Sequence, residues 1–448
     1  MAKPRSTWRC QQCGYAAPKW LGRCPDCGEF ATFVEEVSAS SPGGIAVATG
    51  SPAAVTPLAD VTVSLEHRFP TGIGEFDRVL GGGLVLGSVV LIGGEPGIGK
   101  STLLLQVAGE LGRNGVPVLY VCGEESVQQV RSRADRVGAS TGISLLPEVD
   151  VTTIEATVLA ERPRVVLVDS IQTLFDPGLD GVPGSVGQVR ATAARLVRLA
   201  KANEVTLIVV GHVTKEGSIA GPRVLEHVVD TVLYFEGDSD HAFRIIRAAK
   251  NRFGSVSELG IFEMGESGLL EVGQPSSALL AERATGVAGS VVMATMEGSR
   301  PLLVEVQALV SPSYLQMPRR LSVGIDSARL LQVLAILERR ADVPLGSFDV
   351  YVSIAGGIRV SEPAVDVPLA LALASARRER PVPQDLVAFG ELGLTGDARP
   401  VPHAAARMRE ASRMGFAQAL GPRIEAAQSG LRAIAVRTLG EALEGALG

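Results

Sequence analysis

The residues with the clearest chemical potential form the run Gly94 to Ser101, which reads Gly-Glu-Pro-Gly-Ile-Gly-Lys-Ser and follows the apolar segment Val89 to Gly93. Glycines let backbone N–H groups curl round phosphate oxygens, and a helix that starts here adds the positive end of its dipole. Lys100 would neutralise β- and γ-phosphate oxygens, and the Ser101 hydroxyl would hold Mg²⁺. The run predicts a nucleotide-binding loop that contacts its ligand through Gly94, Glu95, Pro96, Gly97, Ile98, Gly99, Lys100, Ser101 and Thr102.

Three carboxylates follow two later apolar runs. The run Val165 to Asp169 ends in a carboxylate that can reach the water shell of the magnesium ion, so Asp169 joins Ser101 in the predicted metal site. Phosphate hydrolysis also needs a group that polarises the attacking water. Glu124 and Glu125 follow the run Val118 to Gly123, where an open parallel sheet has its binding site. We favour Glu124 as the general base and keep Glu125 as the alternative; a solvated acidic pair is the third interpretation.

Four of the five cysteines lie within the first 27 residues, as two Cys-x-x-Cys-Gly pairs. Each such turn directs two thiolates to one metal, and two turns complete a tetrahedral zinc site. So small a segment buries too little apolar surface to fold alone, and the metal would supply most of its stability, on the order of 10 kcal/mol. A redox role for one pair is the alternative, which the duplication disfavours. The sequence predicts a Zn²⁺ site made by Cys10, Cys13, Cys24 and Cys27.

The elements that must position these side chains are short β-branched runs that alternate with helical patterns. Continuous apolar runs of this length are typical of parallel strands buried on both faces by helices. The predicted strands are Val89 to Gly94, Val118 to Gly123, Val165 to Asp169, Thr206 to Gly211 and Thr231 to Phe235. We therefore predict an α/β protein whose segments are a zinc module (1–35), a flexible linker (36–59), a P-loop core (60–273) and a second α/β domain (274–448) with helices at Ser327 to Arg340 and Val367 to Arg380.

The composition limits the setting in which the protein works. The net charge of −6 gives no overall basic field, so any contact with nucleic acid must come from local loops or patches. No stretch has the eighteen apolar residues in a row expected of a membrane helix, and the first nine residues are polar where a signal peptide would be apolar. We expect a cytoplasmic protein with no membrane partner.

Several motifs together resemble a known family. The nucleotide loop, Leu119 to Ser126 and Gly211 to Gly217 resemble the RecA and replicative-helicase core. The pentapeptide Lys250-Asn-Arg-Phe-Gly resembles the signature of the RadA family of bacterial repair proteins, and the cysteine pairs, core and tail occur in that family's order. The resemblance implies a RecA-like ATPase in a hexameric ring, with ATP bound between subunits. Lys250 and Arg252 would then reach a neighbour's γ-phosphate.

The resemblance also assigns a sensor and the DNA-facing loops. His212 is similar to the polar sensor that links the γ-phosphate to the loop after the fourth core strand. That loop, 215–223, and the four-glycine loop Asp176 to Gln188 resemble the mobile loops of RecA-type rings. Lys215 and Arg223 are the expected phosphate contacts with DNA.

The tail resembles the catalytic domain of the Lon protease, through Gly356 to Pro368 and Gly390 to Pro402. Lon uses a serine that is activated by a lysine. In this chain the position of the serine holds Asp366, and the position of the lysine falls near Ala405. From Asn251 to the end of the chain there is no lysine, so a Ser–Lys dyad cannot form in this domain. We expect a scaffold that helps to assemble the ring; its arginine pairs either contact DNA or only solubilise helix faces.

The expected function is that of a DNA-dependent ATPase in recombinational repair, which by family resemblance loads on single-stranded or branched DNA and drives branch migration with RecA. Its expected cofactors are ATP, Mg²⁺ and Zn²⁺. One alternative is a nucleotide-switched DNA-binding scaffold. The other is an ATP-dependent protease, against which the missing dyad counts.

Overall fold

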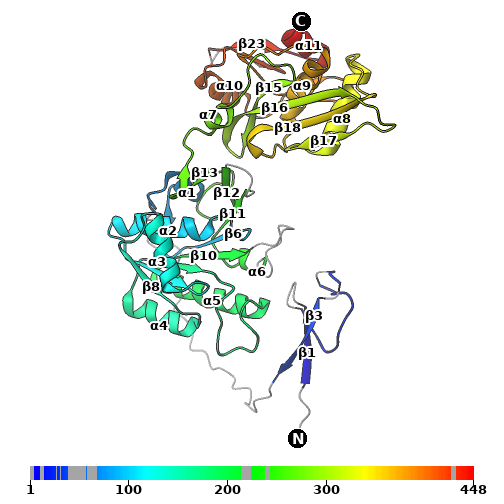
Figure 1. Ribbon diagram of the computed structural model, residues 1–448. Helices are drawn as coiled ribbons and strands as arrows, with labels where there is room; N and C mark the ends of the chain where they lie inside the picture. Colours follow the sequence, from blue (N-terminus) through cyan, green and yellow to red (C-terminus); the bar gives the residue numbers. More distant parts are fainter. Residues whose placement is uncertain are drawn as a thin grey trace. The chain divides into compact units, whose positions relative to one another are not determined.

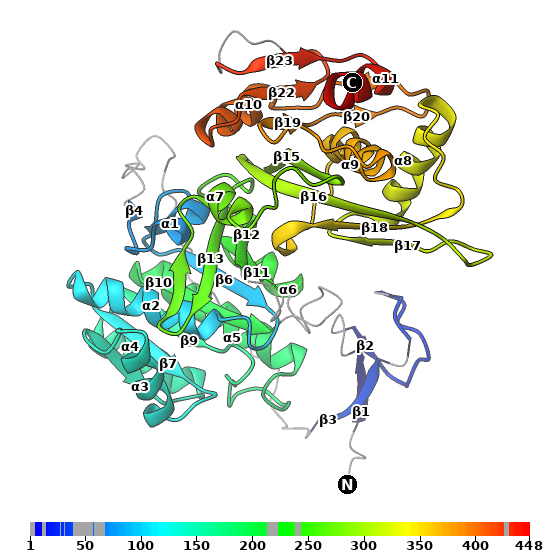
Figure 2. The same ribbon diagram turned by 45° about the horizontal axis from the view of Figure 1, so that its top comes forward.

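We describe the chain from a computed structural model of its 448 residues. The described residues are 5–10, 15–26, 28–30, 32–38, 57, 68–212, 223–237, 243–424 and 430–448. Internal contacts divide the chain into two compact units (Figures 1 and 2). The first unit comprises Met1–Asp238, Arg244–Val256 and Phe262–Glu271, and the second comprises Ser239–Phe243, Ser257–Ile261 and Val272–Gly448. The predicted limits of the four segments stay predictions.

The main sheet of the first unit has nine strands in the order β14-β13-β12-β11-β6-β10-β9-β7-β8. Six neighbouring strands are parallel, which confirms the predicted α/β class: β6 (Val89–Gly94), β7 (Val118–Cys122), β8 (Ile143–Leu146), β9 (Val165–Asp169), β10 (Thr206–His212) and β11 (Thr231–Glu236). Strand β12 (Phe243–Asn251) adds antiparallel to β11, and β13 (Leu259–Gly265) with β14 (Gly268–Glu271) extends the sheet as an antiparallel pair. This extension was not predicted.

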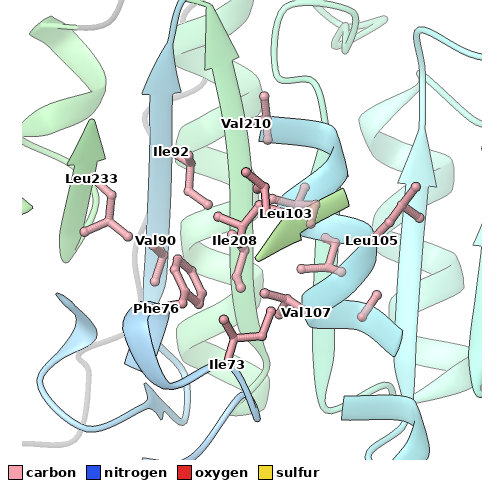
Figure 3. Close-up of a cluster of buried hydrophobic side chains, with 14 of the residues drawn as sticks. Ile73, Phe76, Val90, Ile92, Leu103, Leu105, Val107, Ile208, Val210 and Leu233 are labelled. Atoms are coloured by element: carbon pink, nitrogen blue, oxygen red, sulfur yellow. The ribbon is translucent and has the colours of Figure 1, made fainter. Parts of the chain in front are cut away.

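The strands are apolar throughout because side chains on both faces of the sheet are buried. On β6, Val90 and Ile92 belong to one buried cluster, while Val89 and Leu91 belong to a second. Figure 3 shows the first cluster, in which Val90 lies beside Phe76 of helix α1. The helices of this unit are α1 (Gly74–Leu80), α2 (Lys100–Arg113), α3 (Val127–Arg136), α4 (Val151–Glu161), α5 (Val186–Asn203) and α6 (Arg223–Glu226), and a small pair is formed by β4 (Arg68–Phe69) and β5 (Leu84–Val85).

The N-terminal module is a small antiparallel sheet in the order β2-β1-β3, formed by β1 (Arg5–Cys10), β2 (Ala16–Ala17) and β3 (Phe33–Ser38). Among its described residues, the buried cluster consists of Cys10, Ala17, Cys24 and Phe33, with Trp8 and Leu21 packed against it. A core of this size is far smaller than a protein module normally needs without a metal or disulfide.

The second unit contains a seven-stranded mixed sheet in the order β17-β18-β16-β15-β19-β22-β23. The strands are β15 (Ser290–Glu297), β16 (Arg300–Pro312), β17 (Arg320–Val323), β18 (Phe348–Ile354), β19 (Leu386–Ala388), β22 (Gln418–Gly421) and β23 (Arg432–Ala435), and β20 (Glu391–Leu392) pairs with β21 (Ala398–Arg399).

Five α-helices accompany that sheet among the described residues: α7 (Pro275–Leu280), α8 (Ser327–Arg340), α9 (Asp366–Arg378), α10 (Ala404–Arg413) and α11 (Leu439–Leu447). Helix α8 has the predicted bounds because the Asp326 carboxylate accepts hydrogen bonds from the N–H groups of Ala328 and Arg329, an ordinary N-cap. Helix α9 contacts β15 and β16 and is buried from Asp366 to Ser375. No helix in the described part of the chain is long and apolar enough to cross a membrane.

Candidate nucleotide and metal sites

The nucleotide loop joins the end of β6 to the start of α2. Gly97 and Gly99 have φ angles of 80° and 117°, a region that favours glycine. A Cβ at Gly94 would lie 2.7 Å from the Phe235 carbonyl oxygen, so only glycine fits there. Helix α2 begins at Lys100 with neither a side-chain cap nor an acidic residue in its first turn. Its first N–H groups are thus available to an anion, as phosphate binding requires.

Lys100 lies at the centre of the candidate site. Its side chain is almost fully buried, and Nζ donates to the carbonyl oxygens of Gly94 at 2.9 Å and Glu95 at 2.8 Å. Burial lowers the pKa of Lys100, while the charges of Asp169 and Glu124 oppose that shift. The two carboxylates are therefore close enough to act on this ammonium group.

Asp169 and Glu124 come from neighbouring parallel strands, because Cys122 of β7 pairs with Asp169 of β9. The Tyr120 hydroxyl donates to Oδ2 of Asp169 at 2.8 Å, and Oδ1 of Asp169 is buried with no hydrogen-bond partner among the described residues. The Ser170 hydroxyl donates to Oε1 of Glu124. Lys100, Asp169 and Glu124 thus meet at the carboxyl edge of the parallel sheet, where the sequence predicted them.

Glu125 has different surroundings from its neighbour. Its carboxylate forms an ion pair with Arg133 of helix α3. The adjacent residue Ser126 begins that helix with a capping box, in which Ser126 and Gln129 exchange hydrogen bonds. This pairing turns Glu125 toward the helix, whereas Glu124 lies beside Ser170.

Lys250 and Arg252 lie at the opposite, amino-terminal edge of the same sheet. Asn251 pairs with Thr231, and Thr231 pairs with Val90 near the start of β6. Lys250 Nζ donates to the carbonyl oxygens of Glu226 at 2.5 Å and Val229 at 2.7 Å.

Arg252 Nη1 lies 3.1 Å from Oδ1 of Asp230, a buried residue whose other oxygen accepts from the Val89 N–H at 3.1 Å. A strand advances about 16 Å from Val89 to Gly94. The structure therefore does not bring this pair of cations to the nucleotide loop of their own chain.

The remaining predicted contacts are only partly described. Ser101 and Thr102 lie in the first turn of α2. His212 ends β10, and its main chain pairs with Gly94, but its side chain lies outside the described residues. Lys215 lies outside them altogether, and Arg223 begins α6 with its side chain outside them.

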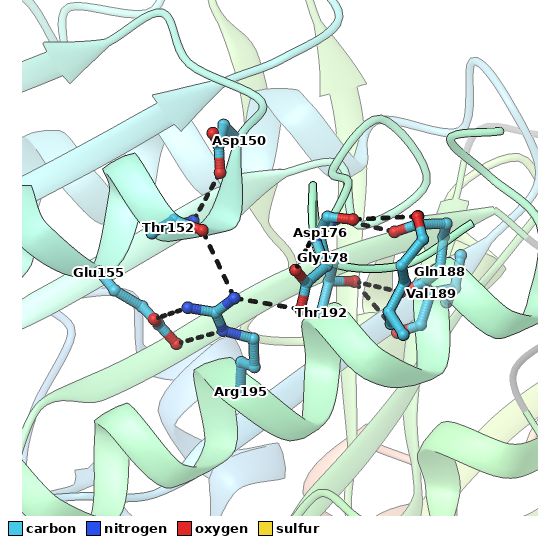
Figure 4. A network of polar contacts seen from close by, with 10 residues as sticks. Asp150, Thr152, Glu155, Asp176, Gly178, Gln188, Val189, Thr192 and Arg195 are labelled. Carbon is cyan, nitrogen blue, oxygen red and sulfur yellow. Dashed lines mark hydrogen bonds and ion pairs between the residues drawn. The ribbon is translucent and has the colours of Figure 1, made fainter. Parts of the chain in front are cut away.

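The loop from Asp176 to Gln188 is fastened at its base, as Figure 4 shows. Gln188 is buried; its side-chain oxygen Oε1 accepts from the Asp176 N–H at 2.7 Å, and its side-chain nitrogen Nε2 donates to the Leu179 carbonyl oxygen at 2.9 Å. Arg195 joins Oδ2 of Asp176 at 3.1 Å and also pairs with Glu155. Farther out, Val182 is 72% exposed. The loop thus has a fixed base and a tip that faces solvent.

Comparison with known proteins identifies the family. A model described as an AAA domain matches residues 56–218, one described as a rubredoxin metal binding domain matches 8–35, and one described as subunit ChlI of Mg-chelatase matches 331–425. "DNA repair protein RadA" of Pseudomonas aeruginosa is 51% identical over 450 residues, 99% of each chain, and that of Bacillus subtilis is 47% identical over 457 residues, 100% of each chain. This chain belongs to the RadA family. The family resemblance predicted from the sequence is confirmed.

The cofactors of this RadA-family chain are ATP with Mg²⁺, and Zn²⁺, and the chain is an ATPase. The chemistry of its residues fits them. Asp169 offers a buried oxygen that has no hydrogen-bond partner in the described part of the chain, as a magnesium site needs. Cys10 and Cys24, one from each predicted knuckle, are buried in a single cluster, and the Gly28 N–H donates to the Cys24 carbonyl oxygen at 2.9 Å. Cys13 and Cys27 lie outside the described residues.

In the second unit of this RadA-family chain, Asp366, which the sequence resemblance places at the position of the Lon nucleophile, has contacts at both carboxylate oxygens. Asp366 begins α9; its Oδ1 accepts from Arg329 Nη1 at 2.8 Å and its Oδ2 from the Leu392 N–H at 3.1 Å. Ala405 lies on α10. Two residues later, the buried Arg407 donates to both carboxylate oxygens of Glu362, at 2.7 and 2.6 Å. The charged side chains around Asp366 and Arg407 are therefore engaged in ion pairs within the unit.

Sequence reasoning missed the side chains that hold the site in place, chiefly Tyr120, Ser170, Arg133 and Gln188. One signal was present for Tyr120. A tyrosine in an otherwise apolar buried strand needs a partner for its hydroxyl, and a carboxylate at the end of the next strand can provide one. Choosing Asp169 as that partner still required the register of β7 against β9.

Proposed function

We propose that this protein is a DNA-dependent ATPase of recombinational DNA repair, which processes recombination intermediates and promotes branch migration together with RecA. In this proposal it works as a ring-shaped, helicase-like motor on single-stranded DNA. The meeting of Lys100, Asp169 and Glu124 at one edge of the sheet carries the ATPase part. The names of the relatives, which are DNA repair proteins, support the setting.

Each residue has a defined task in ATP hydrolysis. Backbone N–H groups from Gly94 to Gly99 and the start of α2 cradle the phosphates, and Lys100 stabilises the charge that develops on them. Ser101 and Asp169 hold the magnesium ion, which when bound neutralises phosphate oxygens. Glu124 accepts a proton from the attacking water. We choose Glu124 over Glu125 because the latter is paired with Arg133, away from Lys100.

We further propose that Lys250 and Arg252 complete the site of a neighbouring copy. Their position at the far edge of the sheet supports this, because neither cation lies near the nucleotide loop of its own chain. A cation supplied in trans lowers the barrier only when subunits are in contact, which couples hydrolysis to ring assembly.

DNA binding would use local positive charge, since the whole chain is acidic. We propose Lys215 and Arg223 as phosphate contacts and the exposed tip of loop 176–188, which carries Asp180, as a neighbour along the same path. His212, which follows β10 and precedes Lys215, would relay the state of the γ-phosphate to this region.

ATP turnover with and without single-stranded DNA, measured across a salt series, tests the proposal. We expect DNA to stimulate turnover and salt to remove the stimulation steeply, because phosphate contacts release counterions. Lys100→Ala should lower turnover by about 100-fold or more. Tight ATP binding without DNA stimulation would favour the switched scaffold instead, and cleavage of a peptide substrate would favour the protease.

Mixing two inactive variants tests whether neighbouring copies share one ATPase site. Arg252→Ala and Lys100→Ala are each defective, but a mixed ring contains interfaces with an intact loop on one side and an intact arginine on the other. We expect mixing to recover part of the turnover. No recovery in rings shown to contain both variants would contradict a finger that acts in trans.

A further inference from the structure

The two site carboxylates are held by a reciprocal pair of hydroxyl groups. Tyr120 lies on β7 and donates to Asp169 at the end of β9. Ser170, the first residue after β9, donates back to Glu124, which follows β7. Each strand thus supplies one carboxylate and one hydroxyl, and each hydroxyl binds the carboxylate of the other strand.

The side chains of this arrangement are buried, and burial restricts the directions in which their oxygens can point. Tyr120 is 1% exposed, Asp169 is 6% exposed and Ser170 is fully buried. A buried carboxylate with one oxygen held by a donor cannot turn freely about its Cβ–Cγ bond, and its second oxygen is presented in one direction. In Asp169 that second oxygen, Oδ1, has no partner among the described residues.

The Tyr120 hydroxyl remains a donor at neutral pH. Burial, reinforced by the adjacent Asp169, raises the pKa of Tyr120 well above its ordinary value.

We propose that Tyr120 and Ser170 are positioning residues of the ATPase: Tyr120 aims the free oxygen of Asp169 at the magnesium ion, and Ser170 aims Glu124 at the attacking water. This inference rests on the proposed site and adds the residues that fix its geometry. Partners that orient metal-associated carboxylates govern metal affinity without touching the metal. The two hydroxyls should therefore affect different steps.

The first experiment compares full-length Tyr120→Phe with wild type, using Mn²⁺ and ADP as probes. Loss of the hydroxyl should weaken Mn²⁺ binding to the ADP complex, followed by electron paramagnetic resonance, by about 10-fold or more. ADP binding without metal should stay unchanged. The matched control is Tyr351→Phe, which removes the same hydroxyl from β18 of the second unit and should leave both values unchanged.

The second experiment uses Ser170→Ala and Ser170→Thr. Ser170→Ala should lower kcat by about 10-fold and shift the acid limb of its pH profile, with Mn²⁺ affinity retained, because it acts through the general base. Ser170→Thr keeps a hydroxyl and should restore kcat in part. We call the two pairs Tyr120–Asp169 and Ser170–Glu124 the hydroxyl clamp. If Tyr120→Phe does not fold, the Ser170 series still tests this clamp.

The outcomes separate the clamp from the proposed function. Wild-type Mn²⁺ affinity in a folded Tyr120→Phe, or an equal loss in Tyr351→Phe, would overturn the role of Tyr120. A wild-type pH profile in Ser170→Ala would overturn the role of Ser170. If DNA fails to stimulate turnover while Tyr120→Phe still loses Mn²⁺, the proposed function fails and the clamp stands.

Discussion

Two buried carboxylates, one in each unit of this protein, have opposite surroundings. In the first unit, Asp169 has one oxygen bound by Tyr120 and one buried oxygen that has no hydrogen-bond partner among the described residues. In the second, Asp366 has both oxygens occupied, by Arg329 and the Leu392 N–H. Buried polar groups are normally satisfied, so an exception at a strand end marks a place for a ligand, and complete satisfaction marks a structural role. The contrast separates a working site from a position that only resembles one.

The largest expected effect on activity concerns the two adjacent glutamates of the first unit, Glu124 and Glu125. Glu124→Gln should lower ATP turnover by about 100-fold, because the amide cannot accept the proton of the attacking water. ATP binding should persist, which equilibrium binding of a labelled nucleotide would check. Glu125→Gln serves as the matched control and should stay close to wild type. The reverse order of the two losses would assign the base to Glu125.

The next test removes an ion pair from the second unit. Arg407→Ala leaves Glu362 partly buried without its partner and should lower the free energy of unfolding by about 3–5 kcal/mol. Burial by itself raises the pKa of Glu362, but hydrogen bonds and charge from Arg407 outweigh it and leave that pKa below 4.5. In the wild type this stabilisation is present above pH 4.5 and is lost as the pH falls through the lowered pKa.

The stability deficit of the variant should also depend on pH. Without Arg407, only the hydrogen bonds from the Met296 N–H and the Thr295 hydroxyl offset the burial of Glu362, so its pKa rises above the wild-type value and the ionised carboxylate loses stabilisation. Chemical denaturation at several pH values would measure the deficit, which should shrink under acid conditions. A deficit that does not vary with pH would show that Glu362 is not the group responsible.

The smallest expected effect comes from Asp366→Ser, which restores serine at the nucleophile position of the protease. We expect no cleavage of a fluorescent casein substrate above background, because the lysine position falls near Ala405 and this domain has no lysine. ATP turnover should change little, since the residue lies in the other unit. Measurable cleavage would show that the unit retains peptidase chemistry.

The sequence predicted those parts of the protein that depend on local pattern. Apolar runs predicted five of the six parallel strands but missed β8, whose side chains are only partly buried, and glycine spacing predicted the loop that ends at Lys100. The strands β12 to β14 were not predicted because their burial alternates or is partial, as at Arg247 and Glu263, and their place depends on pairing with β11 and with one another. The choice between Glu124 and Glu125 depended on side-chain partners from Ser170 and α3, which adjacent positions in a sequence cannot distinguish.

Because β12 pairs antiparallel with β11, the two edges of the sheet in each copy carry different functional groups. Its last residues place Lys250 and Arg252 at one edge of the sheet, while the nucleotide loop opens at the other. A copy that lends a cation at one edge and borrows one at the opposite edge cannot do both with the same partner in a twofold pair. In the proposed trans arrangement, copies follow one another head to tail, and a linear row leaves one unused donor and one incomplete acceptor at its ends. In that arrangement, only closure of the row gives every copy a finished pocket.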